Sequence, residues 1–322
     1  MLVCRGLPGP HMVMAYKLGG YGFTRVMAEL ERTSWRGMQV DHPAEWELAI
    51  ACGVDEPPRC VFADRCYHRL DIRWRALAFE PHMDLVLQKH RRRTEKQSDT
   101  PVKDLTGAPP QWQGVVRNIS EGTIVNAVRF VPDARWLVDV VLAWPKTRDV
   151  NLENRILASI SVEDPGAKAR LWQAMGISLS LGRQFDLVRC QARVGQVKWH
   201  FATDQKRSPK LLVERIALPE YWLKGALRDW LLQQVPSKHK VSRQDAVKTS
   251  GHSGEKILSR GKLGALASIR GLAEIILGVA WLCPVEQRVY HVRVSDITRQ
   301  PEISLPGDLN VRCCRPAPVA KH

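Results

Sequence analysis

Two neighbouring runs of β-branched and aromatic residues constrain the fold more than any other feature of the sequence. Residues 123–131 and 136–144 are rich in Val, Ile and aromatic side chains, which favour a pleated sheet. The turn-like residues 132–134, which include a proline, separate the two runs. The pattern predicts an antiparallel hairpin, and therefore a sheet in the middle of the chain.

A second hairpin is indicated by residues 185–192 and 197–203, which flank a turn at Gly195. Composition and spacing also predict strands at 156–162, 210–218 and 288–294. They predict helices at 23–31, 167–175, 219–231 and 263–282.

The predicted fold class is α+β, with a central antiparallel sheet, flanking helices, a loop-rich N-terminal region and basic flexible linkers. A chain of 322 residues exceeds the common size of one domain, so we expect several units. The predicted units are a loop-rich α region (1–87), a basic linker (88–110), a central α+β domain (111–235), a basic Gly/Ser loop (236–264), a helix and strand (265–300), and a tail (301–322).

The formal net charge of +15 restricts the class of partner. Residues 151–300 carry 24 basic and 13 acidic side chains, so most of the excess lies there. Such a bias attracts polyanions, which are nucleic acid, an acidic membrane surface or an acidic partner protein, whereas a role in solubility alone is the alternative explanation. The apolar stretch 264–285 is interrupted by Arg270 and Glu274, and its longest uncharged run, 275–285, is too short to span a membrane. Because the first 24 residues contain no secretory signal, the expectation is a cytoplasmic protein without a membrane partner.

The second predicted hairpin has two chemically different faces. Alternation places Val197, Trp199 and Phe201 on one face and Lys198 and His200 on the other. Two further cations, Arg189 and Arg193, lie on the facing strand. A row of cations on a sheet can follow a phosphate backbone, whereas an exposed polar face with incidental charge is the alternative explanation.

The segment 236–264 adds a second candidate for nucleic-acid binding. It carries the cations Lys238, Lys240, Arg243, Lys256, Arg260 and Lys262 among serines and glycines. Its four glycines, at 251, 254, 261 and 264, make it loosely similar to the glycine-rich basic loop of RAMP-type CRISPR RNA-binding proteins, although the spacing departs from that family. The resemblance implies contacts to RNA.

Three cysteines and a histidine lie within 17 residues and form a chemically acceptable zinc set: Cys52, Cys60, Cys66 and His68. Structural sites usually pair ligands two to four residues apart, a spacing that this set lacks. Buried free thiols are the alternative, and zinc is the only cofactor that the sequence suggests.

The residues from Asn118 to Gly122 are similar to the short Asn/Asp-x-Ser-x-x-Gly motif of PilZ domains. In that family the motif contacts cyclic di-GMP. The family's preceding pair of arginines is absent, and a turn at the entry to a strand explains the same residues.

The first functional hypothesis is a nucleic-acid-binding protein, with RNA or single strands favoured, that acts alone or within a ribonucleoprotein complex. The second is a metal-independent endoribonuclease with a histidine base, for which His200 and His291 are the candidates. The third is a scaffold protein that docks an acidic partner. Whether the protein is an enzyme stays open at this point.

Overall fold

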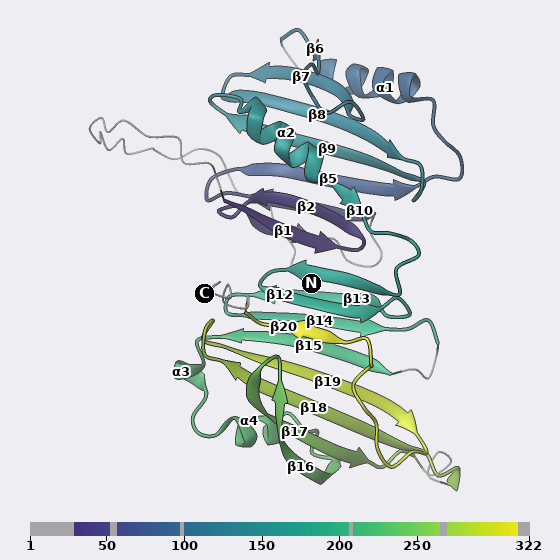
Figure 1. The fold of residues 1–322 in the computed structure, drawn as a ribbon, viewed down its shortest axis with the longest axis vertical. Coiled ribbons are helices and arrows are strands. Elements are labelled where there is room, and N and C mark those ends of the chain that lie inside the picture. The colour runs from purple at the N-terminus through teal and green to yellow at the C-terminus, as the bar shows by residue number, and fades with distance from the viewer. Residues whose placement is uncertain (1–28, 52–56, 97–99, 206–208, 265–268, 315–322) are drawn as a thin grey trace, which may run out of the picture.

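The computed structural model describes residues 29–51, 57–96, 100–205, 209–264 and 269–314, and these are mostly β-structure (Figure 1). Strands account for 52% and helices for 13%. The described residues form three antiparallel sheets and four short helices. The predicted class, α+β with one central sheet and flanking helices, is therefore wrong. No helix of the described part of the chain has the length and apolar character needed to cross a membrane.

Two of the three sheets have seven strands each. The first has the order β3-β4-β5-β9-β8-β7-β6 and contains β3 (Glu47–Ala51), β4 (Arg59–Ala63), β5 (His68–Ala76), β6 (Lys103–Asp104), β7 (Gln113–Ile119), β8 (Gly122–Val131) and β9 (Trp136–Pro145). The second has the order β13-β14-β15-β19-β18-β17-β16 and contains β13 (Asp186–Arg193), β14 (Gln196–Ala202), β15 (Lys210–Ala217), β16 (His239–Thr249), β17 (His252–Gly261), β18 (Ala273–Cys283) and β19 (Arg288–Thr298).

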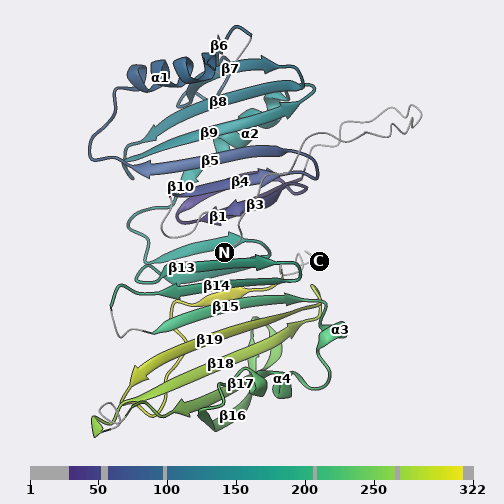
Figure 2. The same ribbon diagram turned by 180° about the vertical axis from the view of Figure 1, so that it is seen from behind.

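The third sheet has six strands and joins the two halves of the molecule. Its order is β10-β2-β1-β11-β12-β20, with β1 (Leu30–Trp35), β2 (Met38–Pro43), β10 (Ser161–Val162), β11 (Ala169–Ala174), β12 (Ile177–Gly182) and β20 (Asn310–Arg312). Strands β1 and β2 lie beside the first sheet, whereas β12 and β20 lie beside the second (Figures 1 and 2). Strands β1 and β11 pair at the single position Ser34–Gln173.

Buried indole rings hold this joint together. Trp35, at the end of β1, packs edge to face against Trp172 of β11, with ring centroids 5.6 Å apart. It packs in the same way against Trp199 of β14, at 5.4 Å. Such pairs contribute more than their buried area alone. The three rings connect the six-stranded sheet to the second seven-stranded sheet through one continuous core.

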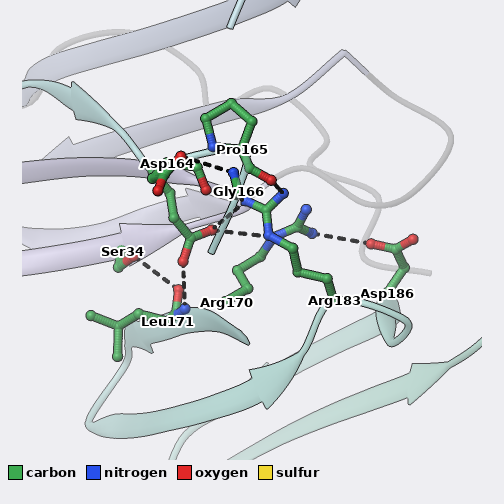
Figure 3. Close-up of polar contacts among 9 residues, drawn as sticks. Ser34, Asp164, Pro165, Gly166, Arg170, Leu171, Arg183 and Asp186 are labelled. Carbon is green, nitrogen blue, oxygen red and sulfur yellow. Dashed lines mark hydrogen bonds and ion pairs between the residues drawn. The ribbon is translucent and has the colours of Figure 1, made fainter. Parts of the chain in front are cut away.

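A network of charges fixes the connection between β10 and β11 at the same joint (Figure 3). One carboxylate oxygen of Glu163 accepts a hydrogen bond from the Leu171 N–H, at 2.8 Å. The other oxygen lies 3.5 Å from both the Arg170 and Arg183 guanidinium groups. Arg183 also donates to the carbonyl of Pro165, at 2.9 Å, so the connection is held along its length.

Both predicted hairpins are confirmed, as β8 with β9 and β13 with β14. The strands predicted at 210–218 and 288–294 are β15 and β19. The helix predicted from Pro219 divides into α3 (Pro219–Trp222) and α4 (Leu227–Gln233).

Other predicted elements are wrong. Residues 169–174, expected in a helix, form β11, and the second half of the apolar stretch at 263–282 forms strand β18. The predicted strand at 156–162 is mostly the end of α2 (Val150–Ser159), whose N-cap Asp149 accepts a hydrogen bond from the Leu152 N–H at 3.1 Å.

The segments predicted to be loops and flexible linkers are also ordered. Residues 30–76 contain five strands, and the helix predicted at 23–31 lies mostly outside the described residues, with 30 and 31 in β1. The first third of the basic stretch 88–110 continues α1 (Met83–Glu95), a helix of good helix formers with arginines in its last turn. The Gly/Ser loop at 236–264 is the hairpin β16–β17.

His42, on β2, is a buried neutral histidine. Its Nδ1 donates to the carbonyl of Pro43, at 2.9 Å, and its Nε2 accepts from the hydroxyl of Thr33, at 2.9 Å. Burial lowers its pKa, although three carboxylates of the same corner oppose the shift, Glu31, Asp41 and Glu45. The unfolded chain therefore binds a proton at pH values where the folded chain does not.

We expect the free energy of unfolding to fall as the pH drops below about 6.5, because the unfolded state gains the proton first. The slope from one such histidine is at most about 1.4 kcal/mol per pH unit. Urea unfolding at pH 7.5 and 5.5 measures the loss. His42→Asn, which keeps a donor near the Nδ1 position, should show a smaller loss than the natural chain, and an equal loss would contradict this role of His42.

Candidate functional site

The outer face of the first seven-stranded sheet carries charge along strand β5. Leu70, Ile72 and Trp74 are buried in the core, so alternation directs Asp71, Arg73 and Arg75 to the opposite face. Both arginines are exposed.

Helix α1 lies on this face, next to β7 and β8. The Nε2 atom of His90 lies 2.9 Å from Oδ1 of Asp139 on β9, which is an ion pair when the ring is protonated. Arg91 donates to the carbonyl of Val102, at 3.2 Å, and to the carboxylate of Asp104. Together with buried Thr94, these contacts hold the helix on the sheet.

A cleft of about 590 Å³ separates part of α1 from the sheet. We call it the α1 cleft. Its cationic lining residues are Arg73, Arg75, Lys89, His90, Arg93 and Arg117. Its acidic lining residues are Asp71 and Asp139, and its apolar floor includes Val86, Ile124 and Val141.

The two carboxylates of the cleft are already engaged. Asp71 accepts hydrogen bonds from Arg59 and Arg73, each at 2.8 Å. Burial alone would raise the pKa of Asp71, but these two guanidinium groups hold it below its usual value. Asp71 therefore stays ionised and neutralises positive charge on its own side of the cleft.

Three exposed cations keep the cleft positive. Arg75, Lys89 and Arg93 form no ion pair within the described part of the chain. A second hollow of about 560 Å³ lies beside the same helix, lined by Leu85, Gln88, Lys89, Arg92, Arg93 and Lys96. The helix thus presents positive charge over a surface wider than the cleft, which can attract and hold an elongated anionic ligand.

The cations predicted to form one nucleic-acid surface are divided between opposite edges of the second seven-stranded sheet. Arg189 and Arg193 lie on β13 and Lys198 on β14, at one edge. The remaining predicted cations lie at or near the other edge, on or beside β16 and β17: Lys238, Lys240, Arg243, Lys256, Arg260 and Lys262. Strands β15, β19 and β18 separate the groups, a gap of roughly 19 Å at ordinary strand spacing.

Several of these cations are paired with carboxylates. Lys198 lies 3.0 Å from Glu214, and Lys238 lies 3.3 Å from Glu274. Arg243 lies 2.8 Å from Asp245 on its own strand. The glycine-rich segment compared with RAMP loops consists largely of the turn at 250–251 and strand β17.

The candidate catalytic histidines lie on different strands. His291 is 1% exposed beneath α4, with its Nδ1 3.3 Å from Glu214 and its ring against Trp230. Burial lowers its pKa and keeps it from bulk solvent. His200 is partly buried, and its pKa is lowered by burial and then by Arg189. Because the buried His291 cannot reach a substrate, it does not support an endoribonuclease.

The predicted zinc ligands are not brought together in the described residues. Cys60 is buried in β4, whereas Cys66 and His68 are exposed at and after the turn into β5. Cys52 lies outside the described residues. The PilZ-like residues form the turn between β7 and β8, where Thr123 donates to the Asn118 side chain at 3.3 Å.

The α1 cleft was not predicted from the sequence, although two signals for it were present. Residues 69–75 alternate charged and apolar side chains, which predicts a strand with one charged face. The basic run 89–96 follows Leu85, Val86 and Leu87. Together the two segments predict one helix with an apolar side and a basic side.

Comparison with known proteins gives matches among solved structures. No protein-family model matches the chain, and no curated protein does. The immunity protein TplEi of the T6SS from Pseudomonas aeruginosa, complexed with "L" peptide, is 10% identical with a TM-score of 0.37, over 88% of this chain and 99% of that one. A chain of the Tle4–Tli4 complex is 9% identical with a TM-score of 0.37, over 89% and 98%. Apo TplEi is 10% identical with a TM-score of 0.34, over 89% and 98%.

The prediction of a nucleic-acid-binding protein, with its endoribonuclease alternative, is wrong. The predicted cationic surface is split across a sheet and partly neutralised by Glu214, Glu274 and Asp245.

Proposed function

We propose that this chain is a protein-binding protein whose α1 cleft docks an acidic segment of a partner protein. The observation that carries the proposal is a cleft of about 590 Å³ in which Arg75, Lys89 and Arg93 have no ion pair within the described part of the chain. Carboxylates of a partner would supply the missing negative charge.

The lining supports a protein ligand in particular. Val86, Ile124 and Val141 give the cleft apolar surface, which suits side chains flanking an acidic residue. The indole ring of Trp74, which belongs to the lining, is buried and offers no platform on which a base could stack. The basic hollow beside α1 shares Lys89 and Arg93 with the cleft, and it lengthens the surface in a way that suits an extended segment.

The position of the cleft also supports binding. It lies between a helix and a sheet that polar side-chain contacts hold together, so it needs little rearrangement to accept a ligand. The proposal agrees with the peptide and complex described for the similar solved structures, but it rests on the charges of the cleft and not on those likenesses.

The test uses three labelled probes: a decapeptide with six glutamates and four leucines, the same peptide with glutamine for glutamate, and an oligothymidylate of equal charge. We expect the glutamate peptide to bind at least about tenfold more tightly than the glutamine peptide, and less tightly as salt rises, because salt screens exposed charges. Fluorescence anisotropy measures the dissociation constants. Tighter binding of the oligothymidylate than of the glutamate peptide would contradict the proposal.

A further inference from the structure

Four metal-binding side chains converge where the end of the described chain meets the second seven-stranded sheet. His252 begins β17, Cys283 ends β18, and Cys313 and Cys314 follow β20. One ligand atom of each lies within 4.8 Å of the ligand atoms of the others. None of these residues belongs to the α1 cleft.

The separations match those of a tetrahedral site. Sγ of Cys314 lies 3.4 Å from Nε2 of His252 and 3.9 Å from Sγ of Cys313. Around a tetrahedral zinc ion, Zn–S and Zn–N bond lengths of about 2.3 and 2.0 Å place neighbouring ligand atoms about 3.5 to 3.8 Å apart. The four groups therefore need only small movements to coordinate one ion.

The backbone at the two adjacent cysteines supports the same conclusion. Neighbouring side chains of a strand point to opposite faces, but the Cys313 and Cys314 sulfur atoms approach each other just after β20 has ended. The hydroxyl of Ser250 donates to the carbonyl of Val311, and the hydroxyl of Tyr290 lies 3.4 Å from the carbonyl of Cys313. The segment is thus held in a conformation that brings both sulfurs to one point.

We propose that His252, Cys283, Cys313 and Cys314 bind one zinc ion. Three thiolates and one imidazole are a common donor set of structural zinc sites, and with all four positions taken by protein the site has no open position for catalysis. Cys283 and Cys313 are 0% and 5% exposed, so the ion would be largely shielded from solvent.

The ion would fasten the last strand of the described chain to its neighbours. Strand β20 pairs with β12 over three residues, Asn310 to Arg312, which is a short attachment. Zinc would cross-link the residues after β20 to β17 and β18, and so connect the six-stranded sheet to the second seven-stranded sheet. Because a preformed site exists only in the folded chain, zinc binding would stabilise the fold.

The test measures zinc in the full-length protein after purification under reducing conditions and dialysis. We expect one zinc per chain, a higher unfolding midpoint with zinc than after chelation, and the visible absorption bands of tetrahedral thiolate coordination when cobalt(II) replaces zinc. Cys314→Ser and His252→Gln should each weaken zinc binding by roughly a hundredfold or more, because each removes one of the ligands. Cys66→Ser, at an exposed thiol outside the cluster, is the matched control and should keep the zinc.

Circular dichroism of the metal-free variants separates loss of the site from loss of the fold, since both substituted positions are only half-buried. Three outcomes would overturn the proposal. They are less than one tenth of an equivalent of zinc in the natural chain after zinc has been supplied, unchanged zinc binding in both variants, and a disulfide between Cys313 and Cys314 in protein kept under reducing conditions.

Discussion

Trp35→Ala should lower the free energy of unfolding by about 3 to 5 kcal/mol, because truncating a buried aromatic leaves a large cavity. The side chain is 0% exposed and contacts the rings of Trp172 and Trp199. Neither ring can move far enough to fill the space, since each is itself fully buried. A loss of this size is a large part of the stability of an ordinary domain, which is about 5 to 15 kcal/mol.

The position of Trp35 makes the effect a test of the architecture. Strands β1 and β11 pair at one position, so the two halves of the six-stranded sheet depend on side-chain packing at the joint. Urea unfolding followed by circular dichroism measures the change. Tyr221→Ala, at an aromatic residue that is 77% exposed, is the control and should change the free energy by less than about 0.5 kcal/mol. A loss below about 1 kcal/mol for Trp35→Ala would contradict the packing described for the joint.

The sequence predicted the hairpins well and the apolar segments poorly, for one physical reason. Residues 123–131 and 136–144 combine β-branched side chains with a turn, which favours a strand on local grounds. In contrast, β18 is apolar on both faces. Helix α4 covers one face, and the core that β18 shares with the six-stranded sheet covers the other. An apolar run without alternation is compatible with a buried helix or a buried strand. Which of the two forms depends on the elements that pack against it.

The hairpin β16–β17 was missed for the opposite reason. Strand β16 lies at the edge of its sheet and exposes most of its side chains, so its sequence shows little hydrophobic pattern. Its strand conformation comes from pairing with β17 along its length. Serines, glycines and lysines are compatible with such an edge, where charged residues also discourage pairing with another chain.

The candidate sites depended on tertiary structure in the same way. The cations on either side of the α1 cleft are about 15 residues apart in sequence, on β5 and α1, and only the packing of the helix on the sheet brings them together. The zinc ligands are spread over more than 60 residues, from His252 to Cys314, whereas the predicted set at 52–68 was chosen for closeness in sequence. Closeness along the chain was a poor guide because antiparallel sheets join distant segments.

The measurement that tests the central claim most directly is binding of the glutamate peptide to a chain carrying Arg75→Glu and Arg93→Glu. Both side chains are exposed and form no ion pair within the described part of the chain, so the fold should change by less than about 0.5 kcal/mol. Each substitution replaces attraction by repulsion inside the α1 cleft. We expect the dissociation constant to rise at least about thirtyfold, which corresponds to about 2 kcal/mol.

The matched control reverses the same number of charges elsewhere, at Arg189 and Arg193 on β13, and lowers the net charge of the chain equally. If the α1 cleft binds the acidic segment, this control should keep the dissociation constant within about threefold of the natural value, because it alters only the long-range field. Equal weakening by both double variants would show that the peptide responds to net charge alone, and would contradict a docking site in the cleft.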